Sequence, residues 1–134
     1  RAAIASKTPN NLKNLKNLAY PINDVAGNRT RFVLVHREEL KQTGELASLA
    51  FSLRANKPGA LVKALSYIED QGLNMSRIES RPSKRELGEY IFFVDLELTK
   101  SDEKRHIKLI KALQPLCEHL VHFGTYPSTT IEEI

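Results

Sequence analysis

Two short stretches of this chain hold the residues best suited to grip a small polar ligand. In the first, Asn56 to Val62, Pro58 and Gly59 stand where a strand is expected to give way to a helix. Backbone N–H groups at such a helix start can hold a carboxylate. The second stretch, Glu79-Ser80-Arg81-Pro82, ends a polar strand with an acid, a hydroxyl and a planar cation. Together they predict a site for a ligand that carries both charges.

Hydrophobic spacing predicts the elements that position these stretches. Leu49, Phe51 and Leu53 alternate with small residues, which predicts a strand over residues 47–54. Apolar residues at helical spacing predict a helix over residues 58–71, with Asn56 as a possible cap and Gly72 as a left-handed stop. Further strands are predicted over residues 30–36, 73–81, 88–98 and 120–125. A second helix is predicted from Ser101, and Pro115 should kink or end it.

The strand predicted over residues 88–98 has apolar residues on both faces. Tyr90, Phe92 and Val94 share the face expected to meet the helices, whereas Ile91 and Phe93 point to the other side. Helices can cover only one side of such a sheet. We therefore expect Ile91 and Phe93 to contact a second copy or another region of the protein. The alternative is that they are two tolerated surface hydrophobes.

Two tetrapeptides carry a resemblance to a known family. Gly59-Ala60-Leu61-Val62 and Glu79-Ser80-Arg81-Pro82 match the two signatures of the ACT domain, in the subtype that binds L-phenylalanine in prephenate dehydratases and aromatic amino-acid hydroxylases. The resemblance covers roughly residues 46 to 127. It implies an α+β, ferredoxin-like βαββαβ fold, with a four-stranded antiparallel sheet and two helices on one face.

A second resemblance lies upstream and distinguishes the two parent families. Residues 1–6 and 28–32 look like the end of the catalytic region of prephenate dehydratases. There Thr30, Arg31 and Phe32 would line the substrate site, and Thr30 would assist departure of the ring hydroxyl of prephenate. The site would be incomplete in this chain. We therefore expect a partial catalytic-domain segment with its linker over residues 1–45, an ACT domain over 46–127 and a tail over 128–134.

The resemblance also implies a ligand set and partners. The parent enzyme would convert prephenate to phenylpyruvate, carbon dioxide and water without a cofactor, under allosteric control by L-phenylalanine bound between the subunits of a homodimer, or of a tetramer. The predicted ligand-binding residues are Asn56, Pro58, Gly59, Ala60, Leu61, Val62, Asn74, Met75, Ser76, Ile78, Glu79, Ser80, Arg81 and Pro82. Glu79, Ser80 and Arg81 are expected to brace the site, while Leu61, Met75 or Ile78 line the ring pocket. A separate amino-acid sensor or a hydroxylase regulatory region is the alternative.

Plain structural roles compete with these assignments at several positions. Gly59 could be only a helix start, Met75 a core residue, and Glu79 with Arg81 a solvated ion pair. His119 and His122 are expected on opposite faces of a strand and His36 and His106 to be isolated, so no metal site is predicted.

Composition narrows the class of protein. The 134 residues include no run of 18 apolar residues, which argues against a membrane helix and leads us to expect a cytoplasmic protein. The net charge of +4 comes from residues 1–46, with 8 basic and 4 acidic residues, since residues 47–134 carry 12 of each. An RNA-binding sheet is therefore disfavoured, also because Asp95 and Glu97 would repel phosphate. The lone Cys117 is expected to pack in the core.

Overall fold

The computed structural model describes residues 4, 16–20, 22, 24, 30–38, 44–54, 57–83 and 88–130. The chain divides into two compact units, Arg1–Val35 and His36–Ile134. The second unit contains, in chain order, the elements β1 Leu46–Leu53, α1 Ala60–Asp70, β2 Asn74–Pro82, β3 Tyr90–Glu97, α2 Glu103–Leu113 and β4 Cys117–Tyr126.

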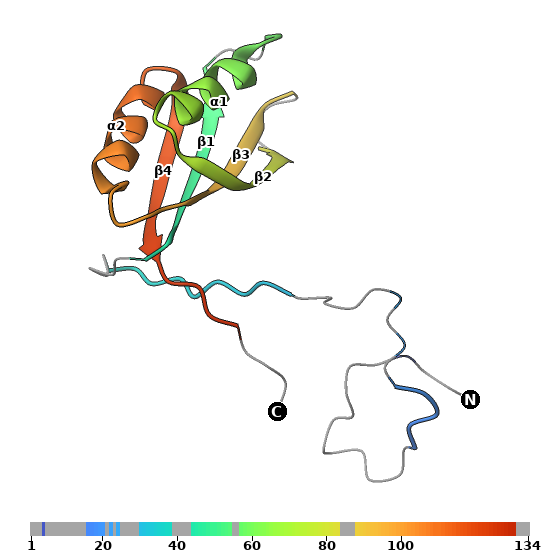
Figure 1. Cartoon of the computed structure of the whole chain (residues 1–134). Helices are drawn as coiled ribbons and strands as arrows, with labels where there is room; N and C mark the ends of the chain where they lie inside the picture. Colours follow the sequence, from blue (N-terminus) through green and yellow to red (C-terminus); the bar gives the residue numbers. More distant parts are fainter. Residues whose placement is uncertain are drawn as a thin grey trace. The chain divides into compact units, whose positions relative to one another are not determined.

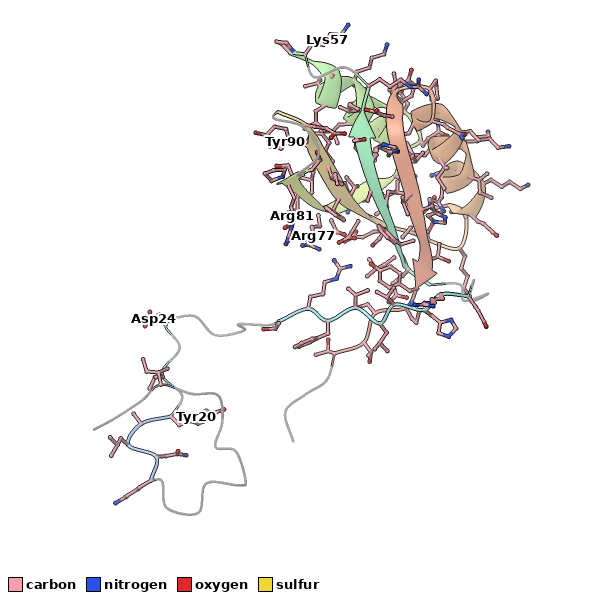
Figure 2. All side chains as sticks on the ribbon, turned by 180° about the vertical axis from the view of Figure 1, so that it is seen from behind. Tyr20, Asp24, Lys57, Arg77, Arg81 and Tyr90 are labelled. Atoms are coloured by element: carbon pink, nitrogen blue, oxygen red, sulfur yellow. The ribbon has the colours of Figure 1, made fainter. Side chains whose placement is uncertain are left out.

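The four strands form one antiparallel sheet in the order β2-β3-β1-β4. Both helices pack on the same face of this sheet, as Figure 1 shows. We call the uncovered face the open face; it is turned toward the viewer in Figure 2. The predicted α+β fold, with its βαββαβ order, is therefore confirmed.

The core lies between the sheet and the two helices. Leu49 and Phe51 of β1 and Leu96 of β3 are almost fully buried, because every second residue of a strand faces the helices. The helices contribute the apolar stripes Ala64 with Ile68 and Leu109 with Leu113, which are buried against these strands. Burying one large apolar side chain stabilises the fold by roughly 1.5–3 kcal/mol. The lone thiol of Cys117 is buried in the same core.

Two glycines bound α1. Gly59 precedes the helix in the left-handed conformation, with φ of 84°, so the helix begins at Ala60 rather than at the predicted residue 58. Gly72 follows it with φ of 63°, and its N–H donates to Glu69 O while the next N–H, of Leu73, donates to Ile68 O. These two bonds form the motif that commonly ends helices at a left-handed glycine, so the predicted stop is confirmed. Asn56, the predicted cap, lies outside the described residues.

The strand predicted over residues 30–36 does not form. These residues have no regular secondary structure, and the side chains of Phe32 and Leu34 are 87% and 103% exposed. Their apolar run resembles a buried strand, but a strand is stabilised by hydrogen bonds to a neighbour, and no strand of the described residues pairs with it. The prediction was therefore wrong at this segment.

The last strand is longer than predicted. β4 covers Cys117–Tyr126 instead of residues 120–125, and two register shifts interrupt its pairing with β1. A bulge adds a residue on one strand and breaks the alternation of apolar and polar side chains. The sequence pattern therefore revealed only the middle of this strand.

Candidate functional site

The two tetrapeptides lie at the same end of the sheet. At this end β1 and β2 finish while α1, β3 and β4 begin, and we call it the upper end, as drawn in Figure 1. The first turn of α1 contributes Gly59 to Val62, and the last residues of β2 contribute Glu79 to Pro82. The opposite end, where Leu46 begins β1, Asn74 begins β2 and Tyr126 ends β4, is the lower end.

The start of α1 offers backbone donors beside an open space. Gly59 has no side chain, and a Cβ built on it would meet nothing within 4 Å. The N–H of Ala60 donates to Lys57 O at 3.1 Å, and Gly59 O accepts from Lys63 N at 3.0 Å. An α-helix supplies no internal acceptor for its first N–H groups, which include those of Leu61 and Val62. This geometry suits an anionic group of a ligand, since the helix dipole also favours negative charge there.

The end of β2 carries a row of charges on the open face. Glu79 lies between two arginines two residues away on either side, so the three side chains share this face. Arg81 Nε donates to Glu79 Oε1 at 2.6 Å, and Arg77 Nη2 donates to Glu79 Oε2. The hydrogen bond from Arg81 is the main cause that lowers the pKa of Glu79, with the charges of both arginines adding to it. The Glu79 carboxylate is therefore held ionised by its own strand.

The other face of β2 is apolar in part. Ile78 lies opposite Val94 of β3 and is 41% exposed, whereas Met75, opposite Leu96, is half-buried against the core. Ser80 lies opposite Phe92 and is exposed, as are Ser76 and Pro82. Leu61, in the first turn of α1, is half-buried against the core as well. Ile78 thus exposes the most apolar surface among the residues predicted to line a ring pocket.

One chain does not bring all of the predicted ligand residues together. Asn74 lies at the lower end, where its Nδ2 donates to Glu97 Oε2 at 2.5 Å. Eight residue steps along β2 separate it from Pro82, or about 26 Å at the rise of a strand. Since α1 runs from the upper end to the lower end, Gly59 and Asn74 lie at opposite ends of the sheet. The predicted set therefore splits into an upper group and a lower group.

The predicted catalytic residues lie in the first unit. Thr30, Arg31 and Phe32 belong to a segment without regular secondary structure, and Thr30 and Phe32 are exposed. Their role in a substrate site stays a prediction.

A pair of histidines was missed in the sequence. His106, expected to be isolated, is only 3% exposed and packs edge-on against His122, with ring centroids 4.6 Å apart. Burial, and then the charge of His122, lower the pKa of His106 to about 4. His122 lies opposite Leu49 and His119 opposite Ser52, which places these two on opposite faces of the sheet. Within the described ranges no three metal-ligating side chains gather.

The comparisons agree with this fold and motif arrangement. Residues 47–113 match the model of the ACT domain family, and the chain belongs to this family.

Within the part of the chain that the structure describes, no helix is long and apolar enough to span a membrane.

The chain is similar over almost its full length to prephenate dehydratases. It is 39% identical over 132 residues to a bifunctional chorismate mutase/prephenate dehydratase of Aquifex aeolicus. The aligned residues make up 98% of this chain and 36% of the relative. It is 41% identical over 119 residues to a prephenate dehydratase of Lactococcus lactis. Here the aligned residues make up 86% of this chain and 42% of the relative. The chain thus spans less than half the length of these relatives.

A solved structure adds a ligand to the comparison. Prephenate dehydratase from Arthrobacter aurescens, determined in complex with L-Phe, superposes with a TM-score of 0.58 at 27% identity. The match covers 74% of this chain and 31% of that protein.

Proposed function

We propose that this chain is the phenylalanine-sensing part of a prephenate dehydratase. The observation that carries the proposal is that both signature tetrapeptides lie at the upper end of the sheet, where the first begins at a left-handed glycine with open space next to it. Similarity to dehydratases extends over 98% of the chain and so includes the residues upstream of the sheet, which favours this parent over a hydroxylase regulatory region. The whole enzyme would convert prephenate to phenylpyruvate, carbon dioxide and water in the cytoplasm, with Thr30, Arg31 and Phe32 at its substrate site.

The ligand would be held between two copies of the chain. A two-fold axis places the same surface of each copy against the other, so the upper end of one copy can lie beside the lower end of its partner. This pairing would join Gly59 to Val62 of one copy with Asn74 to Ser76 of the other. The splitting of the ligand residues supports this arrangement, because a single chain leaves the two groups at opposite ends of the sheet.

The energetics require polar contacts as well as burial of the ring. Burying a phenyl group of about 150 Å² at about 25 cal/mol per Å² contributes roughly 4 kcal/mol, which only matches the lowest estimates of the cost of association. Charge-assisted hydrogen bonds of about 1.5–3 kcal/mol each must therefore hold the ammonium and carboxylate groups. Backbone N–H groups beside Gly59 and the amide of Asn74 are the groups we assign to this task.

Binding across two chains would link occupancy to subunit geometry. L-Phenylalanine, the end product of the pathway that uses this enzyme, would favour the less active arrangement by binding it more tightly, since a ligand shifts an equilibrium only through differential affinity.

Calorimetric titration of the 134-residue chain tests the proposal. We expect L-phenylalanine to bind at sub-millimolar concentration with one molecule per chain, and D-phenylalanine to serve as a control that presents the same ring with inverted polar groups. Titrations with L-tyrosine and L-tryptophan measure how strongly the site discriminates between aromatic side chains. The absence of heat from millimolar L-phenylalanine, with a folded and dimeric chain, would overturn the proposal.

A further inference from the structure

A row of hydrogen-bonded side chains crosses the open face from β4 toward β2. Ser48 Oγ of β1 donates to Asp95 Oδ1 of β3 at 2.5 Å. Tyr126 of β4 places its hydroxyl 2.6 Å from the same Ser48 Oγ. Because the single hydroxyl proton of Ser48 goes to Asp95, the Tyr126 hydroxyl is the donor of the second bond.

The row continues through Asp95 to the second tetrapeptide. Arg77 Nη1 lies 3.8 Å from Asp95 Oδ2, and Arg77 also pairs with Glu79, which in turn accepts from Arg81. The sheet register agrees with these contacts, because Asp95 is the partner of Ser48 on one side and of Arg77 on the other. Figure 2 shows Arg77 and Arg81 together on the open face. We call the six residues the cross-sheet network: Tyr126, Ser48, Asp95, Arg77, Glu79 and Arg81.

Asp95 is the buried centre of this network. Its residue is 5% exposed, although it lies on the face that no helix covers. A buried carboxylate is costly unless it is paired and hydrogen-bonded, so its partners cannot separate from it without a penalty. A shift of Arg77 along β2 is therefore expected to move Asp95 and Ser48 with it. The network can carry a displacement because its central member is held from both sides.

The far end of the network lies where the chain enters and leaves the sheet. Tyr126 ends β4 and is the register partner of Leu46, which begins β1. Next to them, Glu45 accepts two backbone hydrogen bonds at 2.7 Å, from Ser128 N to its side chain and from Leu98 N to its carbonyl. These bonds join the residues through which the sensor is connected to the rest of the chain.

We propose that the cross-sheet network transmits occupancy of the amino-acid site to the lower end of the sheet, where the chain enters at Glu45 and leaves at Ser128. This inference rests on the proposed function, because it assigns the regulation of that same site. Ser48 and Asp95 are positioning residues here. They act through Arg77 on Glu79 and through Tyr126 on the chain ends, and neither belongs to the predicted ligand set.

Amide hydrogen exchange of the 134-residue chain tests the proposal, with L-phenylalanine as the probe. The reporters are the amides of Leu98 and Ser128, which donate to Glu45. We expect saturating L-phenylalanine to change their exchange rates by at least about fivefold, which corresponds to about 1 kcal/mol in the opening equilibrium. Tyr126→Phe, which removes one hydroxyl, should abolish this change while the calorimetric Kd stays within about threefold. Ser48→Ala should do the same.

Ser52→Ala is the matched control. Ser52 lies on the same strand and face as Ser48, four residues on, and its buried hydroxyl has no hydrogen-bond partner among the described residues. This variant should keep the ligand-induced change. If Ser48→Ala fails to fold, loss of the ligand-induced change in exchange in Tyr126→Phe is enough to support the proposal.

Two results would overturn the inference while leaving the proposed function intact. One is binding of L-phenylalanine to the native chain without a change at Leu98 and Ser128. The other is an unaltered change in Tyr126→Phe. An absence of calorimetric binding by the native chain would instead remove the proposed function, and this inference with it.

Discussion

The upper and lower ends of the sheet differ in how far their polar groups are satisfied within one chain. At the upper end, a left-handed Gly59 borders open space and the first turn of α1 presents its N–H groups. At the lower end, Glu45 accepts two backbone hydrogen bonds, Asn74 pairs with Glu97, and Asp102 accepts from the N–H and hydroxyl of Thr99. We therefore propose that the upper end receives the ligand and that the lower end mainly holds the chain, although predicted ligand residues lie at both.

The largest difference in ligand binding between the two ends is expected at the two left-handed glycines that flank α1. Gly59→Asp should weaken L-phenylalanine binding more than about 100-fold, because an anion placed against the ligand carboxylate costs several kcal/mol. Gly72→Asp makes the same change at the lower end, where a Cβ meets only Arg105 at 3.8 Å, and should alter the Kd less than about threefold. Calorimetry measures both, with circular dichroism as the check of folding. Equal losses in the two variants would contradict the assignment of the upper end.

The sheet with its two helices should lose stability in acid, because His106 of α2 is buried. Its folded pKa of about 4 lies below the ordinary value of 6.5, so the unfolded state binds the proton more readily. Stability is therefore full above pH 6.5 and is lost as the pH falls toward 4, by about 2 kcal/mol between pH 7 and pH 4.5. Urea unfolding at the two pH values measures the loss.

Matched leucine variants separate this effect from general acid denaturation. His106→Leu should reduce the difference between pH 7 and pH 4.5, whereas His119→Leu, at an exposed position of β4, should leave it in place. An undiminished difference in His106→Leu would show that the buried imidazole is not its source.

Asn74 tests whether the lower end contributes to the ligand. Asn74→Ala should weaken binding about tenfold, the effect of one lost hydrogen bond to a charged group of about 1.4 kcal/mol. Glu97→Gln keeps the neighbouring side chain but removes its charge, and should change the Kd less. Native affinity in Asn74→Ala would restrict the site to the upper end.

The smallest effect is expected at Glu79. Its carboxylate is occupied by Arg77 and Arg81 and remains partly exposed, and pairs of this kind contribute little. Glu79→Gln should therefore weaken L-phenylalanine binding less than about fivefold. A loss as large as that of Gly59→Asp would make Glu79 a direct ligand of the ammonium group rather than a brace.

Local pattern predicted the elements of the sheet well, because its apolar residues follow the period of a strand or a helix. Gly72 was predicted as the end of α1 for the same local reason, since a left-handed residue is needed there. The run Phe32 to Val35 failed as a strand because pairing depends on a neighbour that the local sequence does not specify.

The sequence predicts the candidate ligand residues as a set, and this set stays a prediction, but it does not predict where in the fold each of them lies. Only α1 and a short turn separate Gly59 from Asn74 in the sequence, yet the direction of α1 puts the two residues at opposite ends of the sheet. The contacts of Asp95 and His106 join residues far apart in the chain, such as Ser48 with Asp95, and no local spacing reveals them. The register of the sheet places Ser48 beside Asp95, and the packing of α2 on β4 places His106 beside His122.

Complementation between two variants tests most directly whether two chains share the site. Chains with Gly59→Asp and chains with Asn74→Ala are unfolded together, refolded as mixed dimers and titrated with L-phenylalanine. A shared site predicts native affinity at about one quarter of all sites, because half of the dimers are mixed and each mixed dimer has one intact site. No recovery in a mixture shown to contain mixed dimers would contradict the account.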